Sequence, residues 1–360
     1  LAMCGSLLTA ERLFGELVER WGLETVLAYL PEIKDHAERR MRIAMGVLPA
    51  GVYRGTSVID DDGVTNDAYH IHAAVAILEN GSVIVDYRGS SPQARGPVSA
   101  AYSVAHAAAL NSLLQVLAAD LPVNQGIHRP LHIIAPPGTV VNVNHPGPLN
   151  SGNTESHNFL AEAILNALLI AAPERGAAPL AGTTCLLTGG AWNPETREPY
   201  TFVTWEVAGW GAMAHADGNN AMGRIASMIV RNIPVEVHET QFPWRIKYWK
   251  LRVGSGGAGR FRGGLGGMRE YQLLAPEFVF GVNSNRARFA PQGVFGGHPS
   301  LPTRWWVRRN GNLIDPLSLG LGLISPDKFS GVRITAGESI VVECPGGGGW
   351  GPPRERERER

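Results

Sequence analysis

Residues 151–173, SGNTESHNFLAEAILNALLIAAP, carry the clearest helix signal in the sequence. Apolar residues recur there at helical spacing, and Pro173 ends the pattern: Leu160, Ile164, Ala167, Leu168 and Ala171. Such spacing places all five on one face of a helix. We therefore predict a helix that opens in the SGNTESHNF stretch, ends before Pro173 and packs this face against a core.

The beginning of this helix is rich in polar side chains: Ser151, Asn153, Thr154, Glu155, Ser156 and His157. Asn153 or Thr154 is the expected N-cap. Unpaired backbone N–H groups and the positive end of the helix dipole favour an anion or a developing oxyanion at such a position. We predict Asn153, Glu155 and His157 as catalytic candidates and Thr154 as a substrate-binding candidate. The alternative is that helix capping alone accounts for Asn153, Thr154 and Glu155.

Upstream of this helix, the sequence predicts a helical segment followed by strands. Residues 9–47 read as two helices divided near Gly22. DDDG at 60–63 is a turn signal, and ENGS at 79–82 is a hairpin signal between the strands HIHAAVAIL and VIVDY. After Pro97 a helix of about twenty residues is expected, ending near 120–122.

Downstream of Thr183, helical periodicity is mostly absent apart from a short helix predicted near 220–231. Strand-like pieces alternate with Gly/Pro turns: YTFVTWEVAG, IKYWKLRV, FVFGV and SIVVEC. We predict an α+β fold. Its expected parts are a helical segment at 1–50, a mixed α/β region at 51–180, a β-rich C-terminal domain at 181–352 and a disordered charged tail at 353–360.

Composition excludes several functional classes. The 360 residues are 44% hydrophobic and 18% charged, which is typical of a soluble globular protein. Lys plus Arg and Asp plus Glu number 32 each, so charge gives no case for nucleic-acid binding. There is no run of eighteen apolar residues, so we expect no membrane span. Three cysteines without a C-x-x-C pair favour a reducing cytoplasm.

The glycine-rich stretch GSGGAGRFRGGLGGMRE, 254–270, contains G-x-G-x-x-G through Gly254, Gly256 and Gly259. A dinucleotide fingerprint must lead into a helix, and RFRGGLGG is too rich in glycine to start one. No G-K-[ST] phosphate loop occurs either. We predict a tight β connection whose glycines permit positive φ angles and close backbone contact. Its three arginines are candidates to contact an acidic partner surface or a phosphorylated intermediate: Arg260, Arg262 and Arg269.

Other motif searches give little support for a metal or nucleophile site. His238-Glu239 begins H-E-x-x-H, but Phe242 stands at the fifth position. His70 and His72 share one strand face and are interpreted as two half-buried histidines rather than as a metal pair. No G-x-S-x-G nucleophile motif occurs.

Taken in order, seven segments resemble the hydantoinase B/oxoprolinase family. They are LVERWGLETVLAYLPEIKDHAERRMR, IVDYRGSSPQARGPVSAAYSV, LPVNQGIHRPLHIIAPPGTVVN, SGNTESHNFLAEAILNAL, NIPVEVHETQFPWRI, LRVGSGGAGRFRGGLGGMREY and ECPGGGGWG. This family comprises B-type subunits of ATP-dependent cyclic-amide hydrolases and of acetone and acetophenone carboxylases. A co-linear series of segments is far more specific than any one of them.

The resemblance implies a heteromeric, two-component enzyme. An A-type partner would bind ATP with Mg²⁺ and phosphorylate a cyclic amide or a ketone. The B-type subunit would complete the reaction at a divalent metal, Zn, Mn or Fe. Family members carry the His/Asp metal cluster in an additional N-terminal part that this chain lacks, so no metal ligand is expected here. Asp217, Arg231 and Asn232 are further candidates to line the reaction chamber.

One segment bears on the branch of the family. Oxoprolinase-type members carry H-M-T-N-T where this chain has ASMIV, 226–230. The resemblance therefore favours the hydantoinase, lactamase or carboxylase branches. We expect a B-type subunit, or a fragment of one, of an ATP-dependent cyclic-amide hydrolase. The alternatives are a subunit of an acetone- or acetophenone-type carboxylase and a non-catalytic scaffold.

Overall fold

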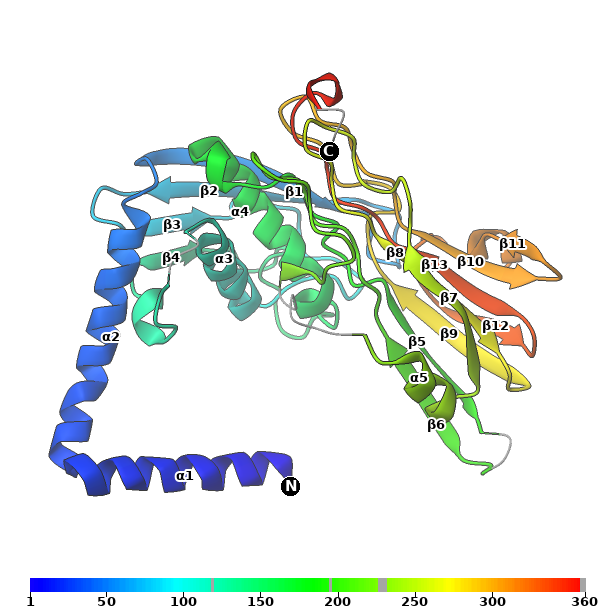
Figure 1. The fold of residues 1–360 in the computed structure, drawn as a ribbon, viewed down its shortest axis with the longest axis horizontal. Coiled ribbons are helices and arrows are strands. Elements are labelled where there is room, and N and C mark those ends of the chain that lie inside the picture. Colours follow the sequence, from blue (N-terminus) through cyan, green and yellow to red (C-terminus); the bar gives the residue numbers. More distant parts are fainter. Residues whose placement is uncertain (118–119, 194–195, 226–231, 357–360) are drawn as a thin grey trace.

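Two long helices form the N-terminal part of the computed structural model, which describes residues 1–117, 120–193, 196–225 and 232–356. They are α1 (Ala2–Trp21) and α2 (Leu23–Met45), and they meet at a sharp corner (Figure 1). The corner is Gly22, whose φ of 80° and ψ of 145° are incompatible with helix continuation. The division near Gly22 is confirmed, although the first helix begins at Ala2 rather than at residue 9.

A four-stranded sheet follows in the order β1-β2-β3-β4. Its strands are β1 (Gly51–Ile59), β2 (Tyr69–Ile77), β3 (Val83–Asp86) and β4 (Leu131–Ile134), with only β3 and β4 parallel. Alternate residues of β2 are buried, whereas His70 and His72 are exposed. The two histidines do share a strand face, but the expectation that they are half-buried is wrong.

Helices α3 (Tyr102–Leu117) and α4 (His157–Ala171) pack on this sheet and complete the first apolar core. The approach of α4 to β1 is close: a Cβ on Gly55 would lie 2.1 Å from the carbonyl oxygen of Ala163. Because nearly every α4 residue up to Leu169 is buried, the helix predicted from its apolar period is confirmed and lies at the centre of the molecule.

The beginning of α4 differs from the expected capped helix. Residues Gly152–Ser156 form a single π-helical turn, and the residue that precedes the α-helix is Ser156, without a side-chain capping bond. The carbonyl of Ser151 accepts from the N–H groups of both Glu155 and Ser156, at 2.8 and 3.1 Å, which widens the turn. The N-cap role predicted for Asn153 or Thr154 is therefore wrong.

Two further sheets build the C-terminal half, in the orders β12-β9-β5-β6 and β11-β10-β13-β8-β7. The strands are β5 (Leu186–Trp192), β6 (Pro199–Thr204), β7 (Trp244–Leu251), β8 (Gly267–Leu273), β9 (Glu277–Asn283), β10 (Arg304–Arg309), β11 (Asn312–Ile314), β12 (Lys328–Thr335) and β13 (Ser339–Glu343). Both sheets contribute to a second apolar core, for example Phe202 and Phe278 from one and Tyr271 from the other. The α+β prediction is confirmed.

Short helices occupy the connections: η1 (Gln125–His128), η3 (Pro173–Arg175), α5 (Val235–Gln241), η5 (Pro316–Leu319) and η6 (Pro353–Glu355). The helix predicted near 220–231 falls partly outside the described residues, and its described part forms a turn and an isolated bridge from Met222 to Ala208. The predicted domain boundaries stay a prediction.

The glycine-rich stretch belongs to a bundle of extended chains, which we call the glycine bundle: residues 209–219, 254–266, 293–298 and 345–351. Backbone hydrogen bonds join these chains, for example from Gly257 N to Gly347 O at 2.9 Å. A Cβ on Gly263 would lie 1.9 Å from the carbonyl oxygen of Gly347. The predicted close backbone contact is confirmed, but among the glycines of 254–267 a positive φ occurs only at Gly254.

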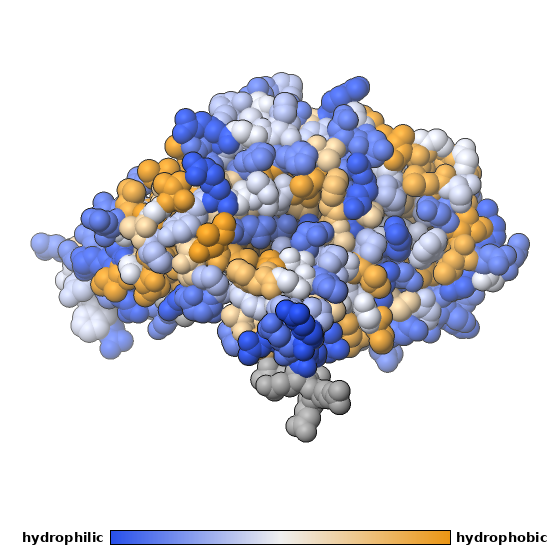
Figure 2. Space-filling model, turned by 90° about the horizontal axis from the view of Figure 1, so that it is seen from above, coloured by the Kyte–Doolittle hydropathy of each residue, from blue (hydrophilic) through white to orange (hydrophobic). Residues whose placement is uncertain are grey.

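The surface seen from above intersperses hydrophilic and hydrophobic residues (Figure 2). Within the described residues, no helix combines the length and the apolar character needed to cross a bilayer.

Candidate functional site

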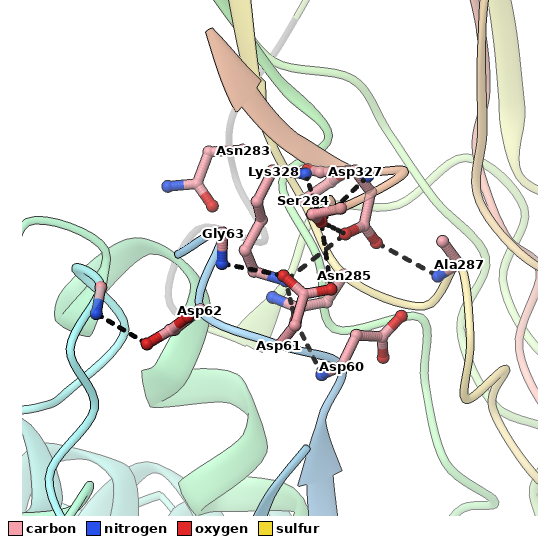
Figure 3. Close-up of polar contacts among 12 residues, drawn as sticks. Asp60, Asp61, Asp62, Gly63, Asn283, Ser284, Asn285, Ala287, Asp327 and Lys328 are labelled. Atoms are coloured by element: carbon pink, nitrogen blue, oxygen red, sulfur yellow. Dashed lines mark hydrogen bonds and ion pairs between the residues drawn. The ribbon is translucent and has the colours of Figure 1, made fainter. Parts of the chain in front are cut away.

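Buried polar side chains gather where the elements of the first core meet those of the second. We call this group the polar seam: Asp60, Asp61, Asp62, Glu155, Asn285, Asp327 and Lys328. They come from the loop after β1, the loop after β9 and the beginning of β12, which Figure 3 shows, and, for Glu155, from the turn before α4. Charged groups are rarely buried unless they are paired, so each member requires an account of its partners.

Glu155 lies at one end of the seam and is 1% exposed. Its carboxylate accepts from the N–H of Thr184 at 2.7 Å and from the hydroxyls of Thr183, at 2.8 Å, and Thr184. The amide nitrogen of Asn285 donates to it from 2.9 Å. These donors come from segments 28 to 130 residues away, so Glu155 joins the turn before α4 to the second core.

Asn285 continues the seam from Glu155 to a buried lysine. Its side-chain oxygen accepts from the Lys328 ammonium at 2.8 Å and from the backbone N–H of Asp60 at 3.3 Å. The ammonium also lies 3.5 Å from Asp327 and 3.9 Å from Asp61. Apart from Asp62, whose carboxylate bonds its own loop and Gly96, the members of the seam are linked by hydrogen bonds and ion pairs.

The charges of the seam shift one another's pKa values. Burial raises the pKa of Asp327 to about 7, against the attraction of Lys328 and with the support of Asp60 and Asp61. Burial alone would lower the pKa of Lys328, but the neighbouring carboxylates, Asp327 first, outweigh it and raise that pKa. Lys328 thus stays protonated, while Asp327 can exchange a proton near neutral pH.

The three consecutive aspartates of this seam have different hydrogen-bond partners. Asp61 accepts from Gly63 N at 2.9 Å and from the Ser325 hydroxyl at 3.0 Å, and one oxygen of Asp60 accepts from Arg288 N at 2.7 Å. The other Asp60 oxygen, Oδ1, is buried and has no hydrogen-bond partner among the described residues.

Asp62 is held by backbone N–H groups and by the hydroxyls of Thr65 and Tyr69. Burial alone would raise its pKa, but hydrogen bonds from Thr65, Gly96, Val64 and Tyr69 outweigh burial and lower it. The sequence indicates only a turn for DDDG, because Asp and Gly are common turn residues. Three consecutive acids directly after a strand are the signal that could have marked this site.

A cavity of about 550 Å³ opens beside the seam. Its lining is mainly apolar, with a few polar side chains: Asp62, Gly63, Val64, Pro97, Val282, Asn283, Gly322, Leu323, Ile324, Lys328, Phe329 and Ser330. The amide nitrogen of Asn283 donates to the hydroxyl of Ser151, whereas its Oδ1 is buried without a partner in the described part of the chain. Small-molecule sites have this size and this mixture of surfaces.

The structure brings three of the predicted residues, Thr154, Glu155 and His157, together beside Arg224. A guanidinium nitrogen of Arg224 donates to the Thr154 carbonyl oxygen at 2.9 Å. His157 is 4% exposed, and burial, followed by the charge of Arg224, lowers its pKa to about 4. Its Nε2 lies 3.2 Å from the amide nitrogen of Asn111. Asn153 is exposed on the same turn. Sequence reasoning missed Arg224, which no local motif marks.

The remaining predicted residues lie elsewhere. Asp217 is in the glycine bundle, where its carboxylate accepts from Arg262 N and pairs with the Arg356 guanidinium at 2.8 Å. Asn232 accepts from Arg269 at 3.2 Å and lines a separate cavity of about 110 Å³ with His238. Arg231 lies outside the described residues. The contacts of Asp217 and Asn232 are thus separate from those of the turn before α4, and their part in a shared chamber stays a prediction.

In the ranges that the structure describes, no group of three or more His, Cys, Asp or Glu side chains is arranged to hold a metal ion. The carboxylates of the seam surround the ammonium of Lys328 instead. The described residues therefore do not fit a divalent metal, and the metal expected for the complete subunit stays a prediction.

A family model described as hydantoinase B/oxoprolinase matches residues 1–353. The chain belongs to the hydantoinase B/oxoprolinase family. The match spans both apolar cores and the whole polar seam, so the seam lies inside the family's own region.

Three relatives within or near this family are informative. The B-type subunit of a putative D-/L-hydantoinase from Pseudomonas sp. (strain NS671) is 29% identical over 96% of this chain and 58% of its own length. The crystal structure of an ATP-dependent caprolactamase from Pseudomonas jessenii has a TM-score of 0.87 and 27% identity, covering 99% of this chain and 61% of that chain. A nucleotide-free acetone carboxylase has a TM-score of 0.83 at 19% identity, covering 97% of this chain and 51% of that chain, and so shares the fold. The chain thus spans about half to three fifths of these relatives.

Proposed function

We propose that this chain is the B-type subunit, or a part of one, of an ATP-dependent cyclic-amide hydrolase. The observation that carries the proposal is the likeness, over nearly the whole chain, to the B-type component of a hydantoinase and to an ATP-dependent caprolactamase. An A-type partner would bind ATP and Mg²⁺ and phosphorylate the substrate. A divalent metal would be held outside the described residues.

We place the cyclic amide in the 550 Å³ cavity beside the seam. A lactam or hydantoin presents an apolar ring edge and a cis-amide N–H, and this cavity offers mainly apolar walls with few polar groups. A rotation of the Asn283 side chain would turn its unpartnered Oδ1 toward the cavity, where it can accept the amide N–H. A buried acceptor without a partner is costly, so a ligand that satisfies it gains binding free energy.

The turn before α4 would support this chamber from one side. Asn153 and His157 remain the catalytic candidates of this turn. With a pKa of about 4, His157 is neutral at pH 7 and acts as a hydrogen-bonding group rather than as a strong base. Glu155, whose carboxylate is buried under four hydrogen bonds, is better assigned as a positioning residue.

The experiment is to co-express the chain, within the complete B-type subunit, with its A-type partner and assay ATP-dependent ring opening of caprolactam and of hydantoin. Replacing Asn283 with Leu should raise KM at least tenfold with little change in kcat, because the variant loses an acceptor for bound substrate. Ser330→Ala, an exposed residue of the same cavity, is the matched control. An unchanged KM for Asn283→Leu, in a variant with the wild-type melting temperature, contradicts this placement of the substrate.

The same preparation distinguishes the alternative functions. Bicarbonate-dependent consumption of a ketone, without ring opening of any amide, identifies a carboxylase component. A complex whose turnover is unaffected by Asn153→Ala, Glu155→Gln and His157→Asn leaves the turn before α4 with a structural role only. We also propose a reducing, cytoplasmic location, because all three cysteines are free.

A further inference from the structure

A second group of buried polar side chains lies outside the polar seam, and we call it the arginine cluster: Glu206, His238, Arg269 and Tyr271. Arg269 and Tyr271 are two positions apart on β8, so their side chains lie on the same face of that strand. Glu206 follows β6, and His238 belongs to α5. A buried ion pair adds little stability compared with apolar side chains of the same size, so such a cluster beside a cavity is a candidate binding site.

The guanidinium of Arg269 is only partly supplied with acceptors. It donates one hydrogen bond to the Tyr271 hydroxyl at 3.0 Å and one to Asn232 Oδ1 at 3.2 Å. Its Nε lies 3.4 Å from Glu206 Oε2 as an ion pair, but neither of these atoms has a hydrogen-bond partner among the described residues. A guanidinium has five N–H groups, so more than half of them are without an acceptor in this part of the chain. Buried donors of this kind favour a ligand that brings acceptors.

The cavity of about 110 Å³ opens beside this guanidinium. Arg269, Asn232 and His238 form its polar side. The other lining residues are mainly apolar: Val203, Thr204, Trp205, Val207 and Ile233. Three of these are exposed and therefore border the opening: Val203, Trp205 and Ile233. The space is larger than one water molecule needs and suits a ligand of a few non-hydrogen atoms.

His238 adds a second polar group to the wall of the cavity. It is 2% exposed, and its ring packs against those of Phe202 and Phe242. Its Nδ1 is buried without a hydrogen-bond partner in the part of the chain that the structure describes. Burial, followed by the charge of Arg269, lowers the pKa of His238, so the neutral imidazole predominates at pH 7 and carries one N–H donor.

We propose that this cavity binds a small monocarboxylate, whose carboxylate pairs with Arg269 and whose apolar body lies against Val207 and Ile233. The two oxygens of a carboxylate fit the planar fork of a guanidinium. Glu206 already neutralises part of the charge of Arg269, which suits a monoanion better than a phosphate dianion. A ligand with an ammonium head would instead be repelled by the guanidinium.

This site differs from the one proposed for the cyclic amide. The two cavities share no lining residue, and the carboxylate proposal does not rest on the amide reaction.

The test is isothermal titration calorimetry on the full chain with acetate, butyrate and hexanoate. Butyramide and inorganic phosphate are the probes of ligand charge. We expect at least one carboxylate to bind saturably, with a dissociation constant of about 1 mM, as a ligand of this size allows. It should bind at least fivefold more tightly than butyramide or phosphate.

Two variants test the location of the site. Asn232→Leu removes a polar group beside Arg269, and Ile233→Glu places a negative charge at the opening. Each should weaken carboxylate binding at least fivefold. Val253→Glu is the matched control, because Val253 is exposed and does not line the cavity.

Glu206→Gln tests the charge of the site with an effect in the opposite direction. It removes the carboxylate that shares Arg269 and keeps the shape of the side chain, so the bound carboxylate should become at least threefold tighter. Carboxylate should then also raise the melting temperature of this variant more than that of the wild type. If Glu206→Gln does not fold, the comparison of Ile233→Glu with Val253→Glu still decides the matter.

Several results would overturn the proposal. The first is the absence of saturable binding for all three carboxylates. Equal affinities for butyrate and butyramide would show that the cavity does not recognise a carboxylate, and tighter binding of phosphate would contradict a monoanion site. Binding that both Asn232→Leu and Ile233→Glu leave unchanged would place the carboxylate elsewhere on the chain.

Discussion

Glu155 and His157 lie two positions apart on one turn and are both buried, but their surroundings differ. Glu155 is ringed by hydrogen-bond donors, which suit a carboxylate. Burial, followed by the charge of the Arg224 guanidinium, disfavours an imidazolium ion at His157. The turn before α4 therefore holds a carboxyl group among hydrogen-bond donors and, two positions on, an imidazole whose pKa is lowered.

This difference predicts how stability depends on pH. His157 has a pKa of about 4 in the folded chain against 6.5 when unfolded, so the unfolded state binds the extra proton between these values. The free energy of unfolding therefore rises with pH across this window and is lost as the pH falls through it. His157→Asn should remove up to about 1.4 kcal/mol per pH unit from that slope.

Urea unfolding at several pH values between 4 and 6.5 measures this slope. The comparison with wild type cancels the opposite contribution of Asp327, whose raised pKa makes its own contribution fall as the pH rises. His70→Asn, on the exposed face of β2, is the control and should keep the wild-type slope. Parallel slopes for wild type and His157→Asn would show that His157 is not held neutral.

At the residue scale, the sequence predicts Glu155 as a site residue but does not predict the residues that bind it. A dense run of polar residues before an apolar helix is a local signal, and local signals can be found in one sequence. Asn285 and Lys328 carry no such mark, because what makes Asn285 a member of the seam is contact with Glu155, 130 positions away, and Lys328 joins through Asn285. Asp60 to Asp62 are visible in the sequence, but their pattern indicates only a turn.

At the element scale, the glycine bundle gives the sharpest prediction. A Cβ on Gly347 would lie 2.0 Å from the carbonyl oxygen of Trp210. Hydrogen bonds fix the backbone at both residues, so neither can move away. Gly347→Ala should therefore destabilise the chain by at least about 3 kcal/mol, as severe overpacking does. Thermal unfolding monitored by circular dichroism measures the effect.

Gly254→Ala is the matched control from the same bundle. Its Cβ would meet open space, so only the positive φ of 79° opposes it. Backbone strain of this kind costs about 1–2 kcal/mol. Equal losses for the two variants would contradict the view that close backbone approach is what requires glycine at Gly347.

Hydrophobic periodicity is enough to predict some elements of this chain but not others. The apolar period of 157–171 predicts α4, although the helix is buried well beyond the one face that the period defines. The π-helical turn before it depends on one carbonyl, that of Ser151, accepting two bonds, and no residue pattern encodes this. The conclusion that 254–259 is not a phosphate loop also rests on the residues that directly follow it. The three other chains of the glycine bundle are distant in sequence, so their contact with this stretch becomes apparent only in the structure.

At the scale of the whole molecule, the polar seam connects two apolar cores. Lys328→Met removes the ammonium between Asp61 and Asp327 and leaves these carboxylates buried without a counter-ion. Breaking a buried ion pair from one side costs about 3–5 kcal/mol. We expect calorimetry at about pH 8, above the raised pKa of Asp327, to show a lower melting temperature, with the single transition divided into two as the cores unfold separately.

Lys247→Met is the control for this change, since Lys247 lies on the edge strand β7, away from the seam. It should leave the melting curve unchanged. A Lys328→Met variant as stable as the wild type would show that the seam carboxylates take up protons without cost, and that the cores are joined by other contacts.

The α+β class and the family can both be inferred from sequence, because they rest on composition, periodicity and the order of segments. How the two apolar cores contact each other cannot be inferred from the sequence. Seam contacts such as Glu155 to Asn285 join residues that are far apart in the chain, and charge patterning along the chain carries no information on which distant groups will be neighbours.

The glycine bundle has one more consequence, for how this protein can change over generations. Most contacts between its chains are made by the backbone, so few side chains are available whose change could compensate for a new one. Every single-base change of a glycine codon that alters the residue introduces a Cβ or stops the chain, and at most glycines of the bundle that Cβ meets a backbone carbonyl. Few single substitutions of these glycines are therefore open to this protein as its sequence evolves.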